Sequence, residues 1–341
     1  MADATKTKPH VPPVDEEWLA QDSEPPLPTT MEVVDSHIHL WDFSTPPYFG
    51  DTYRADANKA GISASVFVEC TMAYRDTGPD KERVVGEVEF ARKQAERHSS
   101  SSLALNAAIV GMVDVTLGDR VVPVLEMLDA ASDGRLRGIR IRAAHDPDPS
   151  VGYGEKGVPA ELLGQAEVLT ALKKLHAAGH SLDVYAFHTQ LPEVEALARR
   201  LPDLPIVVNH IGGPLGVGPY AQIPEEVRTL WTKNMASLAT CENVHVKIGG
   251  FAISRINIVS ASGRQVPPSS QELEELFRPW FDHCLETFGA RRCMFGSNFP
   301  VDKNAMTLTT LVNAIRRLSA KLSGDEASAL LAGTARRFYR I

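Results

Sequence analysis

The stretch Val33-Val34-Asp35-Ser36-His37-Ile38-His39-Leu40 decides the fold of this chain. It begins as a short apolar, β-branched run, which is typical of a buried strand, and it ends in two histidines separated by one residue. Because side chains alternate between the two faces of a strand, His37 and His39 point to one side and Ile38 to the other. Two imidazoles on one side of a strand end can hold one metal ion or polarise one substrate.

Outward from this stretch, apolar runs alternate with helical patterns from Met31 to the end of the chain. The runs predict strands over 32–37, 63–70, 104–110, 136–142, 182–188, 206–210, 244–248 and 293–297. Helices are predicted around Asn58 and over 81–98, 120–131, 165–178, 191–200, 225–240, 270–288 and 308–319, with a closing helix over 325–339. Eight strand-then-helix units predict a closed parallel (β/α)8 TIM barrel. The alternative, a doubly wound open sheet, usually has a glycine-rich turn where this chain has His37-Ile38-His39.

The first thirty residues differ from the rest of the chain. They contain six prolines among charged and small residues, without any periodicity. We therefore predict a proline-rich N-terminal arm over 1–30, followed by one barrel domain over 31–341, with Trp18 and Leu19 as anchors of the arm. Three long connections, 143–163, 212–224 and 251–269, follow strands and would lie at the C-terminal face of a barrel, where substrate loops belong.

Composition restricts the class of protein. The 341 residues carry a net charge of −8 and no basic block, which argues against nucleic acid as a partner. Four well-separated cysteines indicate a reducing compartment rather than a disulfide framework. We see neither a signal peptide nor an apolar run long enough for a membrane span, so we expect a cytoplasmic location and no membrane partner. The expected partner is a small-molecule substrate, and a homodimer is a reasonable expectation for a barrel of this size.

Polar side chains stand near the ends of strands that are otherwise apolar. They are His37, His39, Glu69, Asn106 with Asp114 beyond it, Arg140, Arg142, His188, His210, Lys247 and Asn298. Each alone is most simply a solvated, paired or packed side chain. Together they would converge at one face of a barrel, and a buried polar cluster is costly unless its members pair or bind something. Trp41 follows the histidine pair and would either wall a ring-shaped ligand or pack under the next loop.

At this point the residues resemble a known family. The segment from Val34 to Asp42 resembles the opening strand of the amidohydrolase superfamily, in the amidohydrolase-related branch that holds sugar lactonases and 2-pyrone-4,6-dicarboxylate lactonase. Three further segments fit in the expected order: Leu204-Pro205-Ile206-Val207-Val208-Asn209-His210-Ile211-Gly212-Gly213-Pro214, Val244-His245-Val246-Lys247-Ile248-Gly249-Gly250, and Cys293-Met294-Phe295-Gly296-Ser297-Asn298-Phe299-Pro300-Val301-Asp302. The resemblance covers the chain from Met31 to its last residue.

The resemblance implies a (β/α)8 barrel with hydrolytic or, in some branches, decarboxylating chemistry. It implies that His37, His39 and His210 bind or face a divalent metal, usually zinc, although some similar lactonases work without metal. The family usually has an aspartate in strand 8, which binds metal and acts as general base, and here that residue is Asn298. An asparagine amide takes no proton at neutral pH and brings no charge to a metal. The base must then be His210, His188, Glu69 or Asp302.

The leading hypothesis is hydrolysis of a lactone or related cyclic ester of a small carboxylated or sugar-derived substrate. Activated water would attack the ring carbonyl, and His37, His39 or a metal that they hold would stabilise the oxyanion. Arg140 or Arg142 would bind a substrate carboxylate, and Lys247 would neutralise it or polarise the carbonyl. The alternatives are a metal-dependent non-oxidative decarboxylase of an aromatic or unsaturated acid, an amide or acyl-ester hydrolase, and a ligand-binding barrel without catalysis.

Overall fold

The computed structural model describes residues 14–44, 46–100, 102–151 and 158–341. Its eight strands form one parallel sheet in sequence order. They are β1 (Val34–Ile38), β2 (Ala64–Val68), β3 (Ala104–Gly111), β4 (Leu136–Arg142), β5 (Ser181–Tyr185), β6 (Ile206–Val208), β7 (Val244–Ile248) and β8 (Cys293–Phe295).

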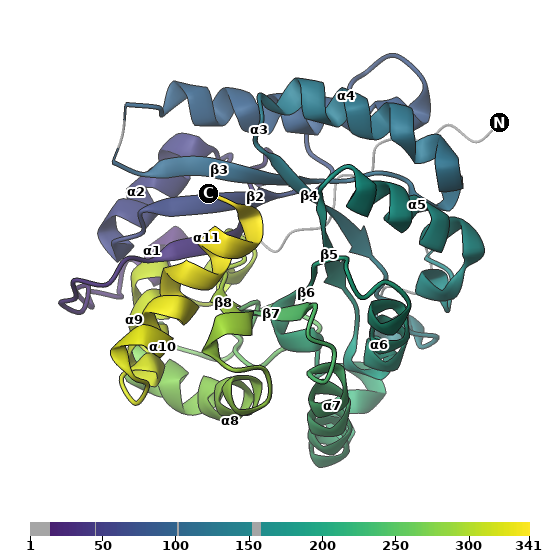
Figure 1. Cartoon of the computed structure of the whole chain (residues 1–341). Coiled ribbons are helices and arrows are strands. Elements are labelled where there is room, and N and C mark those ends of the chain that lie inside the picture. Colours follow the sequence, from purple (N-terminus) through teal and green to yellow (C-terminus); the bar gives the residue numbers. More distant parts are fainter. Residues whose placement is uncertain (1–13, 45, 101, 152–157) are drawn as a thin grey trace.

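Helices surround the strands, as Figure 1 shows. They are α1 (Glu16–Leu19), α2 (Gly50–Ala60), α3 (Val85–Arg97), α4 (Val122–Ser132), α5 (Ala166–Ala177), α6 (Leu191–Arg200), α7 (Pro224–Leu238), α8 (Ser270–Phe288), α9 (Leu308–Ser319), α10 (Gly324–Ser328) and α11 (Thr334–Tyr339). Several begin at a side-chain cap that the sequence supplies. Ser269 and Thr307 cap α8 and α9, and Ser323 forms a capping box with Glu326 at α10.

The sheet closes between its first and last strands. Ile38 pairs with Phe299 just beyond β8, the amide of His39 donates to the carbonyl of Phe299 at 2.8 Å, and the amide of Asn298 donates to the carbonyl of His37 at 2.8 Å. The prediction of a (β/α)8 barrel is therefore confirmed. The alternative of an open sheet is wrong, because β1 and β8 are neighbours and not edges.

Some of the predicted strands extend further along the chain than the strands in the structure. The strands predicted over 182–188 and 206–210 end at Tyr185 and Val208. His210 and Asn298 have φ angles of 53° and 61°, in the left-handed region that a strand does not contain. His188 begins a short 3-10 turn. These three site candidates therefore lie on turns just beyond their strands.

The prediction that Asn106 ends a strand is wrong. Strand β3 continues to Gly111, and Asn106 lies near its start with φ 48°, where its Nδ2 donates to the carbonyl of Ala91 on α3 at 2.9 Å. Asp114, beyond the strand, accepts from the amide of Thr116 and pairs with Lys81 at 3.1 Å. Apolar pattern alone does not separate the start of this strand from its end.

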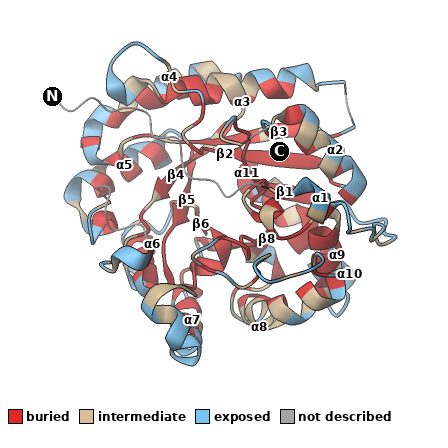
Figure 2. Cartoon of the chain, turned by 180° about the vertical axis from the view of Figure 1, so that it is seen from behind, coloured by how far each residue is buried: buried red, intermediate tan, exposed pale blue. Residues whose placement is uncertain are grey.

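The core has two parts, which Figure 2 shows as the buried strands and inner helix faces. The larger part packs between the sheet and the helices. A smaller cluster contains Val34, Val66, Val110 and Val207 from four strands, and it includes Phe338 and Tyr339 of α11. The last helix therefore closes one end of the barrel. Within the described ranges, we find no helix with the length and apolarity needed to cross a bilayer.

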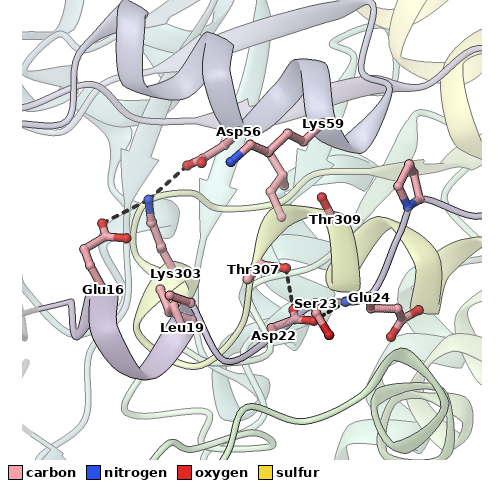
Figure 3. A pocket seen from close by; sticks show the side chains of 13 residues that line it. Glu16, Leu19, Asp22, Ser23, Glu24, Asp56, Lys59, Lys303, Thr307 and Thr309 are labelled. Carbon is pink, nitrogen blue, oxygen red and sulfur yellow. Dashed lines mark hydrogen bonds and ion pairs between the residues drawn. The ribbon is translucent and has the colours of Figure 1, made fainter.

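The described part of the predicted arm lies against α2, α8 and α9. Leu19 is buried, and the buried amide of Asn313 on α9 accepts from the amide of Leu27 at 2.8 Å and donates to Glu24 at 2.8 Å. Figure 3 shows Lys303 between Glu16 of the arm and Asp56 of α2, at 3.1 Å from each. These groups line a surface pocket between the arm and the barrel. Residues 1–13, with the first three predicted arm prolines, lie outside the described residues.

Candidate active site

Three of the predicted histidines meet at the mouth of the barrel. The ring of His37 lies 5.0 Å from that of His39 and 4.5 Å from that of His210, centroid to centroid. All three are buried, while Ile38 between the first two packs in the core outside the sheet. His39 is also stacked on Trp41 at 5.8 Å. The alternation read from the first strand therefore places both histidines on the inner side.

Two glycines allow these rings to approach the backbone. A Cβ at Gly250 would lie 2.3 Å from Nδ1 of His210, and Gly250 has a φ of 74°. A Cβ at Gly296 would lie 2.9 Å from the Cβ of His37. Side chains at these two positions would displace the imidazoles, so the glycines that follow β7 and β8 serve the packing of the site.

Arg140 of β4 joins Glu69 to the histidines. Its Nε donates to Oε1 of Glu69 at 2.7 Å, its Nη2 donates to the Glu69 carbonyl, and its Nη1 lies 3.4 Å from Nε2 of His37. Nε of Arg142 lies 3.2 Å from the same Glu69 oxygen. Burial alone would raise the pKa of Glu69, but the charges of the two arginines outweigh it and hold that pKa below its usual value. Glu69 is therefore an ionised anchor and a weak base.

Lys247 of β7 is fully enclosed inside the barrel. Its Nζ lies 2.7 Å from Oδ2 of Asp183, 2.7 Å from the carbonyl of Ser36 and 3.4 Å from Nδ1 of His37. An ammonium group has three N–H donors, so these three partners use all of them. The predicted contact of Lys247 with substrate stays a prediction, and it would require Lys247 to give up one of these partners.

A cationic donor lies beside each ring nitrogen of His37. Both neighbours of its ring, Lys247 and Arg140, are donors only, and a neutral imidazole has one acceptor nitrogen. Nζ of Lys247 lies 3.4 Å from Nδ1 and Nη1 of Arg140 lies 3.4 Å from Nε2, so the ring can accept from only one of these donors and its other nitrogen carries the proton. If Nδ1 accepts from Lys247, the proton lies on Nε2, and Nε2–H of His37 and Nη1 of Arg140 are two donors 3.4 Å apart.

The three histidines are neutral. Burial, followed by the charge of Lys247, lowers the pKa of His37 far below its usual value, and burial followed by the charge of Arg140 does the same for His210. Burial lowers the pKa of His39 to about 3. Nδ1 of His39 lies 2.8 Å from the Val68 carbonyl, which places its proton there and leaves Nε2 as an acceptor.

Asn298 and Asp302 form a second polar pair beyond β8. Nδ2 of Asn298 donates to Oδ1 of Asp302 at 2.8 Å, and the amide of Ala252 donates to Oδ2 at 3.1 Å. No basic side chain within the described residues pairs with this carboxylate. Burial raises the pKa of Asp302 to about 7. A carboxyl with that pKa exchanges a proton readily at neutral pH.

His188 lies apart from the three central histidines. Its Nδ1 accepts from the amide of Leu215 at 3.4 Å, and its ring meets Tyr220 edge-on at 5.5 Å. Tyr220 in turn donates to the buried Asp146 at 2.7 Å. Burial lowers the pKa of His188 to about 4. Its predicted catalytic role is untested, and its described contacts are with the loop that follows β6 and, through its carbonyl, with Asn234 of α7.

Two residues of this network were missed in the sequence. Asp183 is an acid inside a predicted apolar strand, and that contrast is a signal that could have drawn attention to it. Tyr339 donates from its hydroxyl to Asp183 at 2.8 Å, but it comes from the last helix, and no local pattern connects it with β5.

The residues do not fit a three-histidine metal centre as they are arranged. Each ring nitrogen of His37 faces a cationic donor at 3.4 Å, and Asn298 adds no charge. Among the described residues, no group of three or more histidine, cysteine or acidic side chains is arranged to hold a metal ion. Zinc prefers sites in which lone pairs and negative charge converge, and here cationic N–H groups take that position.

Comparisons with known proteins agree with this barrel. The chain is 28% identical to the uncharacterised protein y4mH of Sinorhizobium fredii, with 91% of this chain and 98% of that protein covered. It is 24% identical to an L-fucono-1,5-lactonase of Burkholderia multivorans, with 90% and 96% covered. A crystal structure of an amidohydrolase from the same species, with bound zinc, superposes with a TM-score of 0.69 at 23% identity, covering 91% of this chain and 99% of that one.

The match to a family model decides the family. The model described as Amidohydrolase matches residues 34–341, which is almost the whole barrel from β1 onward. The match includes both histidines of the first strand and the asparagine that follows the last. This chain belongs to the amidohydrolase family.

Proposed function

We propose that this protein opens a lactone ring by attack of water at the mouth of the barrel, without a metal ion. Family membership makes an ester-bond hydrolase the starting point, and lactonase-named relatives favour a cyclic ester. The observation that carries the proposal is the 3.4 Å approach of Arg140 Nη1 to Nε2 of His37; in the proposal Nε2 carries the proton, so that the two groups form a donor pair. Two adjacent donors suit one oxygen that becomes negative during the reaction.

In this proposal the donor pair binds the carbonyl oxygen of the lactone. As water attacks, charge moves onto that oxygen, and the donor pair stabilises it more strongly than it stabilises the neutral ester. His37 acts as a neutral donor, because burial and nearby charges keep its imidazole unprotonated. Arg140 stays in place because Glu69 accepts from its Nε and Nη2.

Asp302 is the proposed general base. It receives the proton of the attacking water and returns it to the ring oxygen that leaves as an alcohol, so that atoms and charge balance. Glu69 is held by two arginines and Asp183 by Lys247, whereas Asp302 has only neutral described partners. His210 would orient the water, because its ring lies 4.5 Å from that of His37.

The charges of the site favour an anionic or strongly polar substrate. Two arginines, Arg140 and Arg142, lie beside the single carboxylate of Glu69 at this corner of the mouth. Arg142 is partly exposed and is the proposed partner of a substrate carboxylate. Trp41, stacked on His39, would form the wall against which the substrate ring lies. A small carboxylated or sugar-derived lactone meets these requirements.

The test is a panel of carboxylated and sugar-derived 1,5-lactones, assayed by acid release with and without a chelator. In ¹⁸O-labelled water, one labelled oxygen should enter the product carboxylate. Arg140→Ala should lose at least about 10²-fold in kcat. The control is His283→Gln, because His283 lies on α8 and its described hydrogen bond is to the Thr232 carbonyl.

The same assay separates the alternatives. Release of CO₂ from an aromatic or unsaturated acid, with no turnover of any lactone, would replace the proposal with decarboxylation. Saturable lactone binding without turnover would favour the ligand-binding barrel. Turnover that depends on added zinc would overturn the metal-free mechanism but retain the hydrolase.

A further inference from the structure

A buried chain of contacts connects the last helix of the protein with His37. The hydroxyl of Tyr339 donates to the Asp183 carboxylate, at 2.8 Å from Oδ1 and 3.1 Å from Oδ2. Oδ2 of Asp183 lies 2.7 Å from Nζ of Lys247, which in turn lies 3.4 Å from Nδ1 of His37. Tyr339, Asp183 and Lys247 are all fully buried.

We propose that Tyr339 is a positioning residue of the active site, which acts through Asp183 and Lys247 to keep the proton of His37 on Nε2. The role of that proton in oxyanion binding rests on the proposed function. The position of the proton is part of this proposal, because Arg140 and Lys247 compete for the one acceptor nitrogen of His37, and it can be tested without any substrate.

The position of Lys247 depends on Asp183, and the position of Asp183 depends on its other donors. Asn209 Nδ2 donates to Oδ2 of Asp183 at 2.9 Å, and Tyr339 donates from the other side. The ring of Tyr339 also lies under the ammonium of Lys247, with Nζ 5.1 Å from its centroid. A carboxylate held by three donors cannot rotate freely, so Lys247 keeps its third N–H on His37.

A purely structural role is the competing explanation. Tyr339 lies in the apolar cluster that closes the barrel, and Phe338 beside it packs on the ring of His245 at 4.8 Å. If only packing matters, the ring of Tyr339 is needed and its hydroxyl is dispensable. Tyr339→Phe keeps the ring and removes the hydroxyl, so it separates the two roles.

Thr334→Val is the matched control on the same helix. Thr334 is buried, and its hydroxyl donates to the carbonyl of Ala290 at 3.1 Å, a contact that involves none of Asp183, Lys247 and His37. Both variants lose one buried hydrogen bond from α11, so both should lower Tm. Only Tyr339→Phe should lower kcat, by about tenfold, and KM should stay near the wild-type value. This loss is smaller than the loss expected when an oxyanion donor is removed, as in Arg140→Ala.

The decisive measurement is the tautomer of His37, read from ¹⁵N shifts of histidine-labelled protein and assigned with His37→Gln. We expect the proton on Nε2 in the wild type and in Thr334→Val, and a mixture of tautomers in Tyr339→Phe. A proton on Nδ1 in the wild type, or no change in Tyr339→Phe, would overturn the proposal. If Tyr339→Phe does not fold, Asn209→Ala removes another donor to Asp183 and should give the same mixture.

These outcomes separate this inference from the proposed function. If wild-type protein turns over no lactone, the proposed function fails, but the tautomer comparison still decides the role of Tyr339. If lactones are hydrolysed and both α11 variants have the same kcat and the same His37 tautomer as the wild type, the hydrolase stands and the positioning role is refuted.

Discussion

The amide of Asn298 donates from Nδ2 to Oδ1 of Asp302 at 2.8 Å, so the asparagine that follows the last strand lies in direct contact with a buried acid four residues further along. This contact fixes which end of the Asn298 amide faces Asp302. It also places a carboxylate in contact with residue 298, where the family resemblance leads one to expect an aspartate. The loop beyond β8 therefore contains a buried carboxylate at position 302, which is the proposed base.

The pH dependence of activity should follow Asp302. Burial raises its pKa to about 7, and a general base works in its ionised form. We therefore expect kcat/KM to rise with pH, with a midpoint near that value, and then level off. In Asp302→Asn the rising limb should disappear and kcat should fall by at least about 10²-fold. Asp56→Asn is the control: it changes a carboxylate that accepts a hydrogen bond from Lys303, and its pH profile should keep the rising limb. An unchanged profile in Asp302→Asn would assign the proton to another group.

Replacement of Asn298 by aspartate should attract a metal. The change places two carboxyl groups in hydrogen-bond contact, where they share a proton at neutral pH, and it adds negative charge beside the histidines. We expect Asn298→Asp to bind more zinc per chain than the wild type after equal exposure, as measured by elemental analysis. Equal zinc content in the two proteins would mean that position 298 does not face His37 and His210.

Arginine at position 140 should not be replaceable by lysine. Arg140 contacts Glu69 through Nε and Nη2 and His37 through Nη1, and a lysine ammonium cannot span these positions. We expect Arg140→Lys to lower kcat by about 10²-fold. Arg142→Lys is the comparison, because its partly exposed guanidinium should affect KM for a carboxylated lactone more than kcat. Full activity in Arg140→Lys would show that charge alone is required.

Removal of metal should leave the reaction intact. The cationic groups on both sides of His37 occupy the positions that a metal would need. After dialysis against a strong chelator we expect unchanged kcat and KM, and no increase on return of zinc or manganese. Activity that is lost on chelation and regained with one of these metals would contradict the proposed mechanism.

Glu87 should make the fold less stable as pH rises. Burial, followed by the charge of Glu69, raises the pKa of Glu87, whose Oε1 accepts from the amides of Cys70 and Met72. The folded protein then binds this proton more tightly than the unfolded chain, so stability falls as pH rises above the ordinary glutamate pKa.

Glu87→Gln keeps an acceptor for both amides and removes this titration. We expect its Tm, relative to wild type, to be higher at about pH 9 than at about pH 5. Glu89→Gln is the control, because Glu89 is partly exposed and paired with Arg75. A constant difference in Tm across this range would show that Glu87 does not titrate in the folded protein.

The sequence predicted the barrel because its strands are short apolar runs separated by amphipathic helices, and this pattern is local. It also predicted that His37 and His39 share a face, since alternation along a strand is a local property. It did not predict the backbone at His210 and Asn298, where positive φ angles end the strands early. Hydropathy contains no information about such turns.

The contacts between the polar residues could not be predicted either, and the reason is a different one. The sequence predicted that Lys247 faces the substrate. In the structure Lys247 pairs with Asp183 of β5, which also accepts from Tyr339 of α11. Which side chains meet inside a barrel depends on the tilt and register of its strands. Glu69 and Arg140 were each predicted to bind substrate, whereas their described contacts are mainly with each other.

The seam that closes the barrel makes catalysis more fragile than the fold. The segment after β8 meets β1 through one bridge between Ile38 and Phe299 and through the amides of His39, Ser297 and Asn298, whereas β4 and β5 pair over five positions. His37, His39 and Asn298 lie on this seam. We expect local opening there to cost less free energy than unfolding of the other strands. Such an opening would separate the donor His37 from Asn298 and Asp302 while most of the barrel stayed assembled, so thermal inactivation would precede global melting.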